Sequence, residues 1–129
     1  MDSSYIAGFF DGEGCICLAK PNKTSRSYHL SVSITQNNRE ILVEIQKLFG
    51  GGVYPHKVNC YSWQATKKEE AYNFLSSILP YLYLKKKEAE IGLVFLKLNH
   101  NWHKEERELC RKALHLLKTS KGKSSHFKE

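Results

Sequence analysis

The sequence predicts an α+β fold, an antiparallel four-stranded sheet with helices on one face. One observation is the order of the expected elements, which is a helix, two strands, a helix, two strands and then helices. Another is that the two clearest strands alternate apolar with small polar side chains, as half-buried antiparallel strands do. Two hairpins joined by a helix form one such sheet if every helix covers the same face, which leaves the polar face open.

A short helix opens the chain and leads directly into a strand. Ser3 or Ser4 is expected to cap this helix through a hydroxyl oxygen, and Gly12 and Gly14 are expected to end it. The β-prone run at 15–19 then favours the first strand.

Helical spacing gives this first helix two unlike faces. The bulky apolar face, expected to enter the chain's own core, carries Tyr5, Ile6, Phe9 and Phe10. The opposite face has almost no side chain and carries Ser4, Ala7, Gly8, and Asp11 or Gly12. Glycine inside a helix costs roughly 0.5–1 kcal/mol relative to alanine, so a compensating contact is expected at Gly8. A second copy of the same helix is the natural partner for so bare a stripe.

The clearest alternation in the chain lies at residues 27–35, after a polar, basic turn at 20–27. The expected inner face carries Tyr28, Leu30, Val32 and Ile34. The expected outer face carries Ser27, His29, Ser31, Ser33 and Thr35. Small, uncharged donors and acceptors of this kind are also the groups that hydrogen-bond base edges in nucleic acids.

A second helix and a second hairpin follow. Asn37 or Asn38 is expected to cap the helix, and the glycines at 50–52 are expected to end it. Its apolar stripe comprises Ile41, Leu42, Ile45, Leu48 and Phe49. Strands at 53–57 and 60–66 flank a turn at 58–59, and the later strand again has a small, polar outer face, made of Cys60, Ser62, Gln64 and Thr66.

Three further helices are expected in the C-terminal half. The first covers 67–79, ends at Pro80 and points Ala71, Phe74, Leu75 and Ile78 inward. The next two cover about 86–99 and 102–118, and the stripe of the last comprises Leu109, Ala113, Leu116 and Leu117. We therefore expect one domain at 1–118 and a polar, mobile tail at 119–129.

Composition narrows the class of protein. The 129 residues are 41% hydrophobic, enough for one core, and the net charge of +7 favours a polyanionic partner as much as it favours a merely solvated surface. No apolar run approaches the roughly 20 residues that cross a bilayer, so an intracellular, soluble protein of a bacterial, phage or archaeal cytoplasm, or of an organelle, is expected. The four cysteines are too scattered for a disulfide scaffold or a zinc knuckle and are expected to be reduced thiols.

Residues 6–14, Ile-Ala-Gly-Phe-Phe-Asp-Gly-Glu-Gly, resemble the nine-residue signature of the LAGLIDADG homing endonucleases. The alanine, the first glycine, both acids and the last glycine fall in register; Glu13 departs, since aspartate is commoner there. The resemblance implies the αββαββα fold over nearly the whole chain. The signature occurs once, and members with one signature act as homodimers. The implied dimer interface comprises Ser4, Ala7, Gly8, Asp11 and Gly12.

The resemblance also implies site residues. Glu13, assisted by the carbonyl of Gly12, would hold a divalent cation, Mg²⁺ or Mn²⁺. Asp11 matches the family's other acid; it is ranked second as a catalytic residue and is expected more at the helix end or in the interface. Gln36, at the end of the second strand, matches a polar residue that positions the attacking water. Lys85 matches a lysine that stabilises charge at the scissile phosphate. No small-molecule cofactor and no membrane partner are expected.

Double-stranded DNA would lie on the open face of the sheet. The residues expected to reach base edges are Arg26, His29, Ser31, Ser33, Lys57, Ser62 and Gln64. Those expected to position phosphates are Lys20, Lys23 and Lys86.

These observations together favour a homodimeric, Mg²⁺-dependent, site-specific double-strand DNA endonuclease that hydrolyses phosphodiester bonds. Two alternatives stay open. One is a protein of the same fold that does not cut, such as a DNA-binding regulator or an RNA-binding intron maturase. The other is an unrelated, metal-free α+β protein whose basic surface is incidental.

Overall fold

A computed structural model of the chain describes residues 1–19, 28–65, 67–98 and 102–127. Its elements, in chain order, are α1 (Ser3–Glu13), β1 (Gly14–Ala19), β2 (His29–Gln36), α2 (Arg39–Phe49), β3 (Gly52–Lys57), β4 (Cys60–Ala65), α3 (Lys68–Ile78), the 3-10 helix η1 (Leu79–Tyr81), α4 (Lys86–Lys97) and α5 (Lys104–Phe127).

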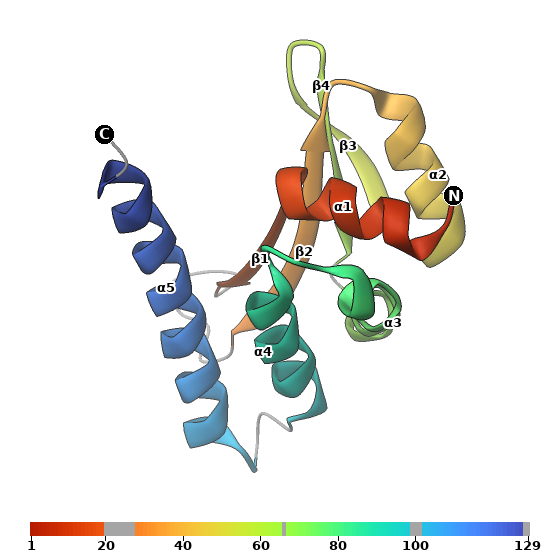
Figure 1. Cartoon of the computed structure of the whole chain (residues 1–129). Coiled ribbons are helices and arrows are strands. Elements are labelled where there is room, and N and C mark those ends of the chain that lie inside the picture. The colour runs from red at the N-terminus through yellow and green to blue at the C-terminus, as the bar shows by residue number, and fades with distance from the viewer. Residues whose placement is uncertain (20–27, 66, 99–101, 128–129) are drawn as a thin grey trace.

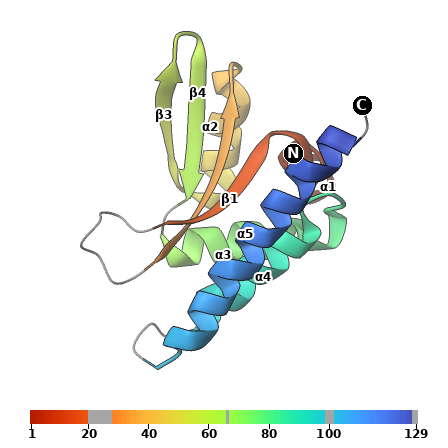
Figure 2. The same cartoon turned by 90° about the vertical axis from the view of Figure 1, so that its left-hand side faces the viewer.

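The four strands form one antiparallel sheet in the order β1-β2-β4-β3. Helices α1 to α4 pack against one face of this sheet, and α5 packs against α4 and the edge strand β1 (Figures 1 and 2). The predicted α+β class and the four-stranded antiparallel sheet are confirmed. The face opposite α1 to α4 is therefore the candidate surface for a large ligand.

α1 begins differently from the prediction. The Oδ1 atom of Asp2 accepts hydrogen bonds from the backbone amide of Tyr5 at 2.9 Å and from the hydroxyl of Ser4 at 2.8 Å. The Tyr5 amide and then the Ser4 hydroxyl lower the pKa of the Asp2 carboxyl. The predicted cap at Ser3 or Ser4 is wrong, because a carboxylate one residue earlier accepts the amide hydrogen that a serine hydroxyl would have accepted.

Gly14 ends α1 as predicted and starts β1 at once. Its backbone N–H donates to the carbonyl of Phe10, and a Cβ atom at this position would collide with the Phe10 ring. Only glycine therefore lets the chain turn from helix into strand over this buried aromatic side chain. The turn fixes the last residue of α1, Glu13, at the end of the sheet.

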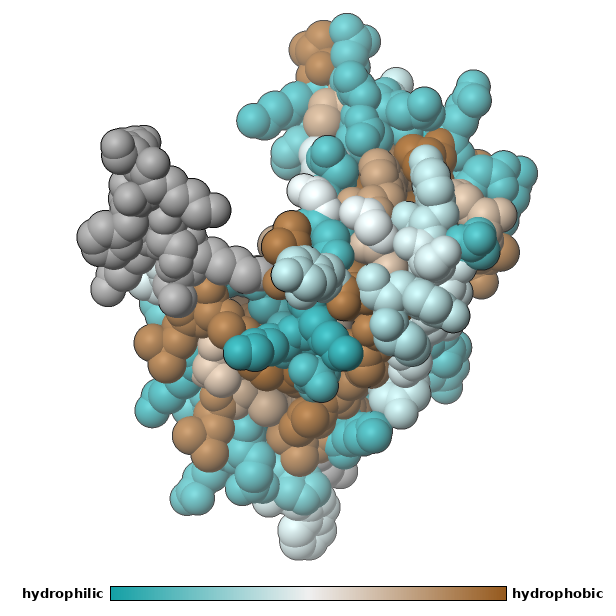
Figure 3. Space-filling view, viewed as in Figure 1, coloured by the Kyte–Doolittle hydropathy of each residue, from teal (hydrophilic) through white to brown (hydrophobic). Residues whose placement is uncertain are grey.

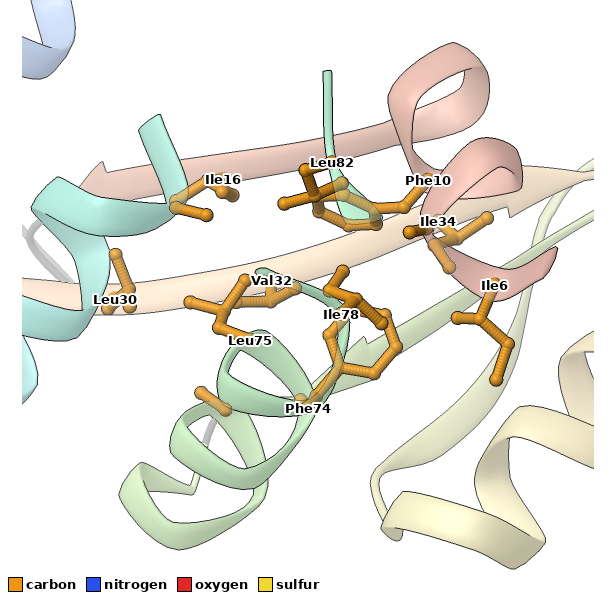
Figure 4. Close-up of a cluster of buried hydrophobic side chains, with 14 of the residues drawn as sticks. Ile6, Phe10, Ile16, Leu30, Val32, Ile34, Phe74, Leu75, Ile78 and Leu82 are labelled. Carbon is orange, nitrogen blue, oxygen red and sulfur yellow. The ribbon is translucent and has the colours of Figure 1, made fainter. Parts of the chain in front are cut away.

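The core joins α1 to the sheet and to α3, with Phe74 near its middle (Figure 4). The Phe74 ring lies 5.4 Å from the ring of Phe10, 5.1 Å from Phe49 and 4.7 Å from Trp63, measured between centroids. The inward residues predicted for α3 are all buried, and so are Leu30, Val32 and Ile34 of β2. The position of α1 therefore depends on aromatic packing against α3.

The glycine run ends α2, as predicted, because two left-handed residues are needed there. Gly50 and Gly51 have φ angles of 82° and 87°, which disfavour any residue with a Cβ atom. Trp63 Nε1 donates to the Gly50 carbonyl at 2.9 Å, and Glu70 accepts from the Gly51 amide at 3.0 Å. Asn38 caps the start of α2 through its side chain.

Two predicted apolar stripes need correction. Leu48 of α2 is exposed, so the buried stripe of that helix is narrower than predicted. In α5 the predicted Leu109 and Leu116 are also exposed, and the buried positions are Cys110 and Leu114. The stripe is displaced because α5 crosses both α4 and the edge of the sheet, a geometry that helical periodicity does not specify.

Arg107 fixes α5 to the body of the chain. Its guanidinium donates to the carbonyls of Tyr28 at 2.9 Å and Leu98 at 3.3 Å, and lies 4.1 Å from the centroid of the Phe95 ring. Desolvation lowers the pKa of Arg107. The helix then continues to Phe127, beyond the predicted end at 118. Among the described residues, no helix is both long and apolar enough to cross a bilayer.

Phe74→Ala should destabilise the fold by about 3–5 kcal/mol, because it removes the ring that three other aromatic side chains contact. Urea unfolding followed by circular dichroism measures this change. Leu116→Ala is the matched control: its side chain is 66% exposed, so an effect within about 0.5 kcal/mol is expected. Equal effects of the two substitutions would show that the core is centred elsewhere.

Candidate functional site

Asp11, in the last turn of α1, binds the segment that connects η1 to α4. Figure 1 shows where α1 and α4 lie. Its Oδ2 accepts from the backbone amide of Tyr83 at 2.8 Å, and its Oδ1 accepts from the backbone amide of Lys85 at 2.9 Å. The Lys85 ammonium also binds Asp11, since its Nζ donates to the backbone carbonyl of Asp11 at 2.6 Å. Three hydrogen bonds therefore place Lys85 at the C-terminal end of α1.

Glu13 is the last residue of α1, and its side chain is exposed. Gly12, just before it, is also exposed. The carbonyls of the last helical turn lack intrahelical partners and carry the negative end of the helix dipole. The end of α1 thus combines a carboxylate with oxygen atoms of negative polarity.

This donor set fits a hard divalent cation such as Mg²⁺, which takes oxygen ligands and keeps several waters. Among the described residues, no group of three or more His, Cys, Asp or Glu side chains is placed to bind a metal ion. The part of the chain that the structure describes therefore supplies only part of a coordination shell. Phosphate oxygens and water are oxygen donors of the kind that complete such a shell.

Gln36 lies at the same end of the sheet as Glu13. It ends β2, two residues beyond Ile34, which pairs with Gly14 at the start of β1. The Gln36 Oε1 atom accepts from the backbone amide of Asn37 at 2.8 Å, which leaves the amide NH₂ group to donate elsewhere. The fold thus brings Glu13, Gln36 and Lys85 to one end of the molecule.

The open face of the sheet is defined by the strand register. Ser33 pairs with both Cys15 and Gln64, and paired residues present their side chains on the same face. We use the name open face for the side chains of Cys15, Cys17, His29, Ser31, Ser33, Thr35, Tyr54, Ser62 and Gln64. These side chains are short or hydrogen-bonding and carry no fixed charge.

Ser62 does not have the accessibility that was predicted for it. Its residue is 4% exposed, and its hydroxyl oxygen accepts from the Gln64 amide nitrogen at 3.4 Å. In the register it lies between Thr35 and Tyr54, whose larger side chains flank it. Ser62 is thus placed to orient Gln64 rather than to meet a base edge itself.

Tyr54 is an open-face residue that the sequence reasoning missed. It is half exposed, and a Cβ atom at Gly52 would collide with its hydroxyl, so the ring lies over that glycine. Residues 53–57 show no alternation of apolar and polar side chains that could have signalled this, and only the register with Ser62 assigns the ring to the open face.

The predicted basic contacts are only partly described. Lys57 is exposed beside the β3–β4 turn, and Lys86 is exposed at the start of α4. Lys20, Lys23 and Arg26 lie outside the described residues.

α5 adds basic side chains along the β1 edge of the open face. The Nζ atom of Lys118 lies 3.9 Å from the sulfur of Cys15, and a cleft of about 230 Å³ lies between α5 and β1. Arg111 and His115 line this cleft together with Lys118. Arg111 is already paired with Glu108 at 2.6 Å, and this contact raises its pKa. Helical periodicity alone gave no signal that this helix borders the sheet.

The outer face of α1 is bare, but its composition differs from the prediction. Gly8 and Gly12 are exposed, and a Cβ atom on either would meet open space. Ser4 is exposed beside them, and pale surface covers this helix in Figure 3. Ala7 is 0% exposed, so the prediction that it contributes to an interface is wrong: its methyl group packs inside its own chain. Tyr5, predicted to point inward, is instead exposed.

Two exposed apolar residues lie next to this face. Tyr83 is 87% exposed and is held beside α1 by the hydrogen bond from its amide to Asp11. Leu84 follows it and is also exposed. Neither residue has a role predicted from the sequence, because their position beside α1 depends on a contact between Asp11 and Tyr83, which are 72 residues apart in the chain.

Comparison with known families gives one match. Residues 6–95 match the family model described as LAGLIDADG endonuclease. The curated intron-encoded DNA endonuclease ai2b of Dictyostelium discoideum is 28% identical over 99 residues, covering 73% of this chain and 37% of that protein. The DNA endonuclease I-CreI of Chlamydomonas reinhardtii is 29% identical over 99 residues, covering 72% and 61%. The match thus spans less than two thirds of each relative.

Solved structures agree in fold. The homing endonuclease I-CvuI, in complex with the I-CreI target in the presence of Mg, superimposes with a TM-score of 0.79 at 25% identity, covering 89% of this chain and 80% of that one. Its DNA was not cleaved. The archaeal intron-encoded homing endonuclease I-Vdi141I, complexed with DNA, gives a TM-score of 0.75 at 22% identity, covering 91% and 82%.

Proposed function

Because the chain belongs to the LAGLIDADG endonuclease family, we propose that it is a site-specific double-strand DNA homing endonuclease that acts as a homodimer with a divalent cation. One observation carries the proposal: an acid, Glu13, and a lysine, Lys85, both lie at the C-terminal end of α1. Its relatives are named as DNA endonucleases, which supports phosphodiester hydrolysis as the reaction class.

Glu13 is the proposed metal ligand, with the carbonyl of Gly12 beside it. A bound Mg²⁺ or Mn²⁺ would neutralise phosphate charge and lower the pKa of a water molecule. The protein fixes the backbone position of Glu13, since α1 is held by the core and by the turn at Gly14, and the carboxylate extends from it into solvent. The longer arm of glutamate, compared with the commoner aspartate, is compatible with this role because both present the same oxygen donors.

Gln36 and Lys85 have complementary proposed roles. The Gln36 amide group can donate a hydrogen bond to, and so orient, an attacking water molecule. The Lys85 ammonium places a positive charge beside the developing negative charge of the phosphate and its leaving oxygen. Gln36 ends β2 beside the start of β1, and Lys85 is bound to the end of α1, so both side chains belong to the end of the sheet where α1 ends.

The dimer proposal rests on the outer face of α1. The exposed glycines Gly8 and Gly12 allow two backbones to approach closely, and the exposed Tyr83 and Leu84 extend the surface with apolar groups. A twofold axis along this face brings both Glu13 side chains near each other. Two cleavage centres would then face the two strands of one duplex.

A DNA library incubated with the purified protein, with and without Mg²⁺, tests the function. Cutting at a defined site that requires the cation would support the proposal. Sequence-specific binding without cutting would favour a regulator of the same fold, and binding to structured RNA alone would favour a maturase. If the protein binds neither DNA nor RNA, the proposed function is rejected.

Contacts to bases and to phosphates should respond differently to substitution. Gln64→Ala should change the preference at particular base pairs, because Gln64 projects from the open face. Lys86→Gln should weaken binding to all DNA sequences alike. It should also reduce the magnitude of the slope of log K against log salt concentration by about 1.8, for one phosphate contact in each of two subunits. Binding titrations on randomised duplexes over a range of salt concentrations measure both effects.

Lys47→Gln is the matched control for charge. Its side chain is exposed on α2, which packs on the sheet face opposite the open face. We expect an unchanged salt slope. An identical base preference in the wild type and in Gln64→Ala would show that DNA uses another surface.

A further inference from the structure

We propose that Asp11 is a positioning residue that locks Lys85 onto α1 of its own chain, so that each cleavage centre takes its acid and its lysine from the same subunit. This inference rests on the proposed function and deepens it. It assigns to the first acid of the signature a role that does not involve the metal ion.

The orientation of the Asp11 carboxylate carries the first step. Both of its oxygens accept backbone amide hydrogens from the segment before α4, at 2.8 Å from Tyr83 and 2.9 Å from Lys85. Hydrogen bonds to a carboxylate are charge-assisted and stronger than neutral ones. A carboxylate held this way faces the connecting segment, whereas Glu13 is exposed at the end of the helix. Asp11 therefore orders the protein, and Glu13 is left to meet the cation.

The second step concerns the ammonium group of Lys85. Its Nζ lies 2.6 Å from the carbonyl oxygen of Asp11, so the backbone and the side chain of one lysine are both tied to one residue of α1. A lysine side chain in solution samples many rotamers, and ordering it costs conformational entropy. The lock removes part of that freedom before any substrate binds.

The same contacts set which subunit supplies the lysine. Asp11 and Glu13 are two residues apart on one helix, and Lys85 is bound to that helix in a single chain. The acid and the lysine thus move together as one piece when two helices meet. A lysine from the other subunit would have to leave its own Asp11 to serve the same centre.

A double-substitution cycle tests the lock. Asp11→Asn keeps the size of the side chain but replaces one amide-accepting oxygen with an NH₂ group that cannot accept. We expect single-turnover cleavage to slow about 100-fold, as a displacement of roughly 1 Å does, with DNA affinity in Ca²⁺ unchanged. Lys85→Met should slow cleavage at least as much, and the double variant should match Lys85→Met alone.

The control cycle pairs Asp11→Asn with Gln36→Ala. Gln36 acts on a different group, so these two losses should multiply. If the rate loss of the double variant Asp11→Asn with Lys85→Met equals the product of the two single losses, the lock is overturned. Amide hydrogen exchange gives a readout without cleavage: in Asp11→Asn the Lys85 amide should exchange about tenfold faster, measured relative to the amides of the central strands β2 and β4. Unaltered exchange there would also overturn the lock.

Heterodimers test the same-subunit assignment. One dimer carries Glu13→Gln and Lys85→Met together on one chain, with a wild-type partner; the other carries one substitution on each chain. If the acid and the lysine act from one subunit, the first dimer keeps an intact centre and nicks one strand, and the second does not nick. The opposite pattern, or equal nicking by both, would overturn the assignment.

These outcomes separate the inference from the proposed function. A wild-type protein that cuts no DNA would overturn the proposed function and the same-subunit assignment with it, while the exchange measurement would still test the lock. A wild-type protein that cuts, together with multiplying losses, would retain the function and reject the lock.

Discussion

Glu13→Gln should reduce double-strand cleavage by about 10³-fold or more, because it removes the negative charge that a hard cation requires at the end of α1. Glutamine keeps the length of the side chain and much of its hydrogen bonding, so the fold should be unaffected at this exposed position. Conversion of supercoiled plasmid to nicked and linear forms in Mg²⁺ measures the loss. This is the largest expected effect of a substitution at the site.

DNA binding should survive Glu13→Gln, or tighten, because a carboxylate beside phosphates is repulsive when no cation lies between them. Dissociation constants in the absence of metal test this sign. Glu44→Gln is the matched control, since Glu44 is an exposed acid on α2 and the substitution makes the same change in charge. Comparable cutting by Glu13→Gln and wild-type protein would reject Glu13 as the metal ligand and leave the fold as it stands.

The sheet was predictable because its physical signal is local. Alternation at 27–35 identifies which side chains of β2 face the core, and Leu30, Val32 and Ile34 are all buried there. The glycines that end α1 and α2 are equally local signals, since a collision with Phe10 or a left-handed φ angle excludes other residues. The four side chains predicted to point inward from α3 are buried for the same reason.

Errors arose where a residue's environment depends on distant parts of the chain. Ala7 lies between the two faces of α1, and helical spacing assigns it to the bare stripe; packing against the sheet and α3 rotates the helix so that Ala7 is buried. Ser62 shares the parity of the open face but is covered by its cross-strand neighbours.

The centre of the candidate site was predictable only in part. The residue types of Glu13, Gln36 and Lys85 were identified by their match to a signature and its family. Their convergence was not, because it requires contacts such as that between Asp11 and Lys85, which are 74 residues apart. Periodicity carries no information on such a distance. Residue roles at this site therefore remain predictions that the substitutions above test.

Gly8→Leu should raise the dissociation constant of the dimer by at least about 30-fold, because a bulky side chain in each subunit separates two helices that meet over bare backbone. Gly8→Ala sharpens the test. A Cβ atom at this position meets open space in one chain, so alanine should stabilise the protomer by roughly 0.5–1 kcal/mol through helix propensity. The same methyl group should nevertheless weaken the dimer.

If Gly8→Ala raises the free energy of unfolding of the protomer but weakens dimer association, the outer face of α1 is a contact between copies, since an effect on folding alone does not produce these opposite changes. Sedimentation equilibrium measures association, and urea unfolding of the dilute protein measures protomer stability. Lys112→Leu, at an exposed position of α5, is the matched control for added bulk and should leave the dimer intact. A wild-type protein that stays monomeric at micromolar concentration, with and without DNA, would contradict the dimer. A monomer would then have to cut both strands with a single Glu13 as its metal ligand.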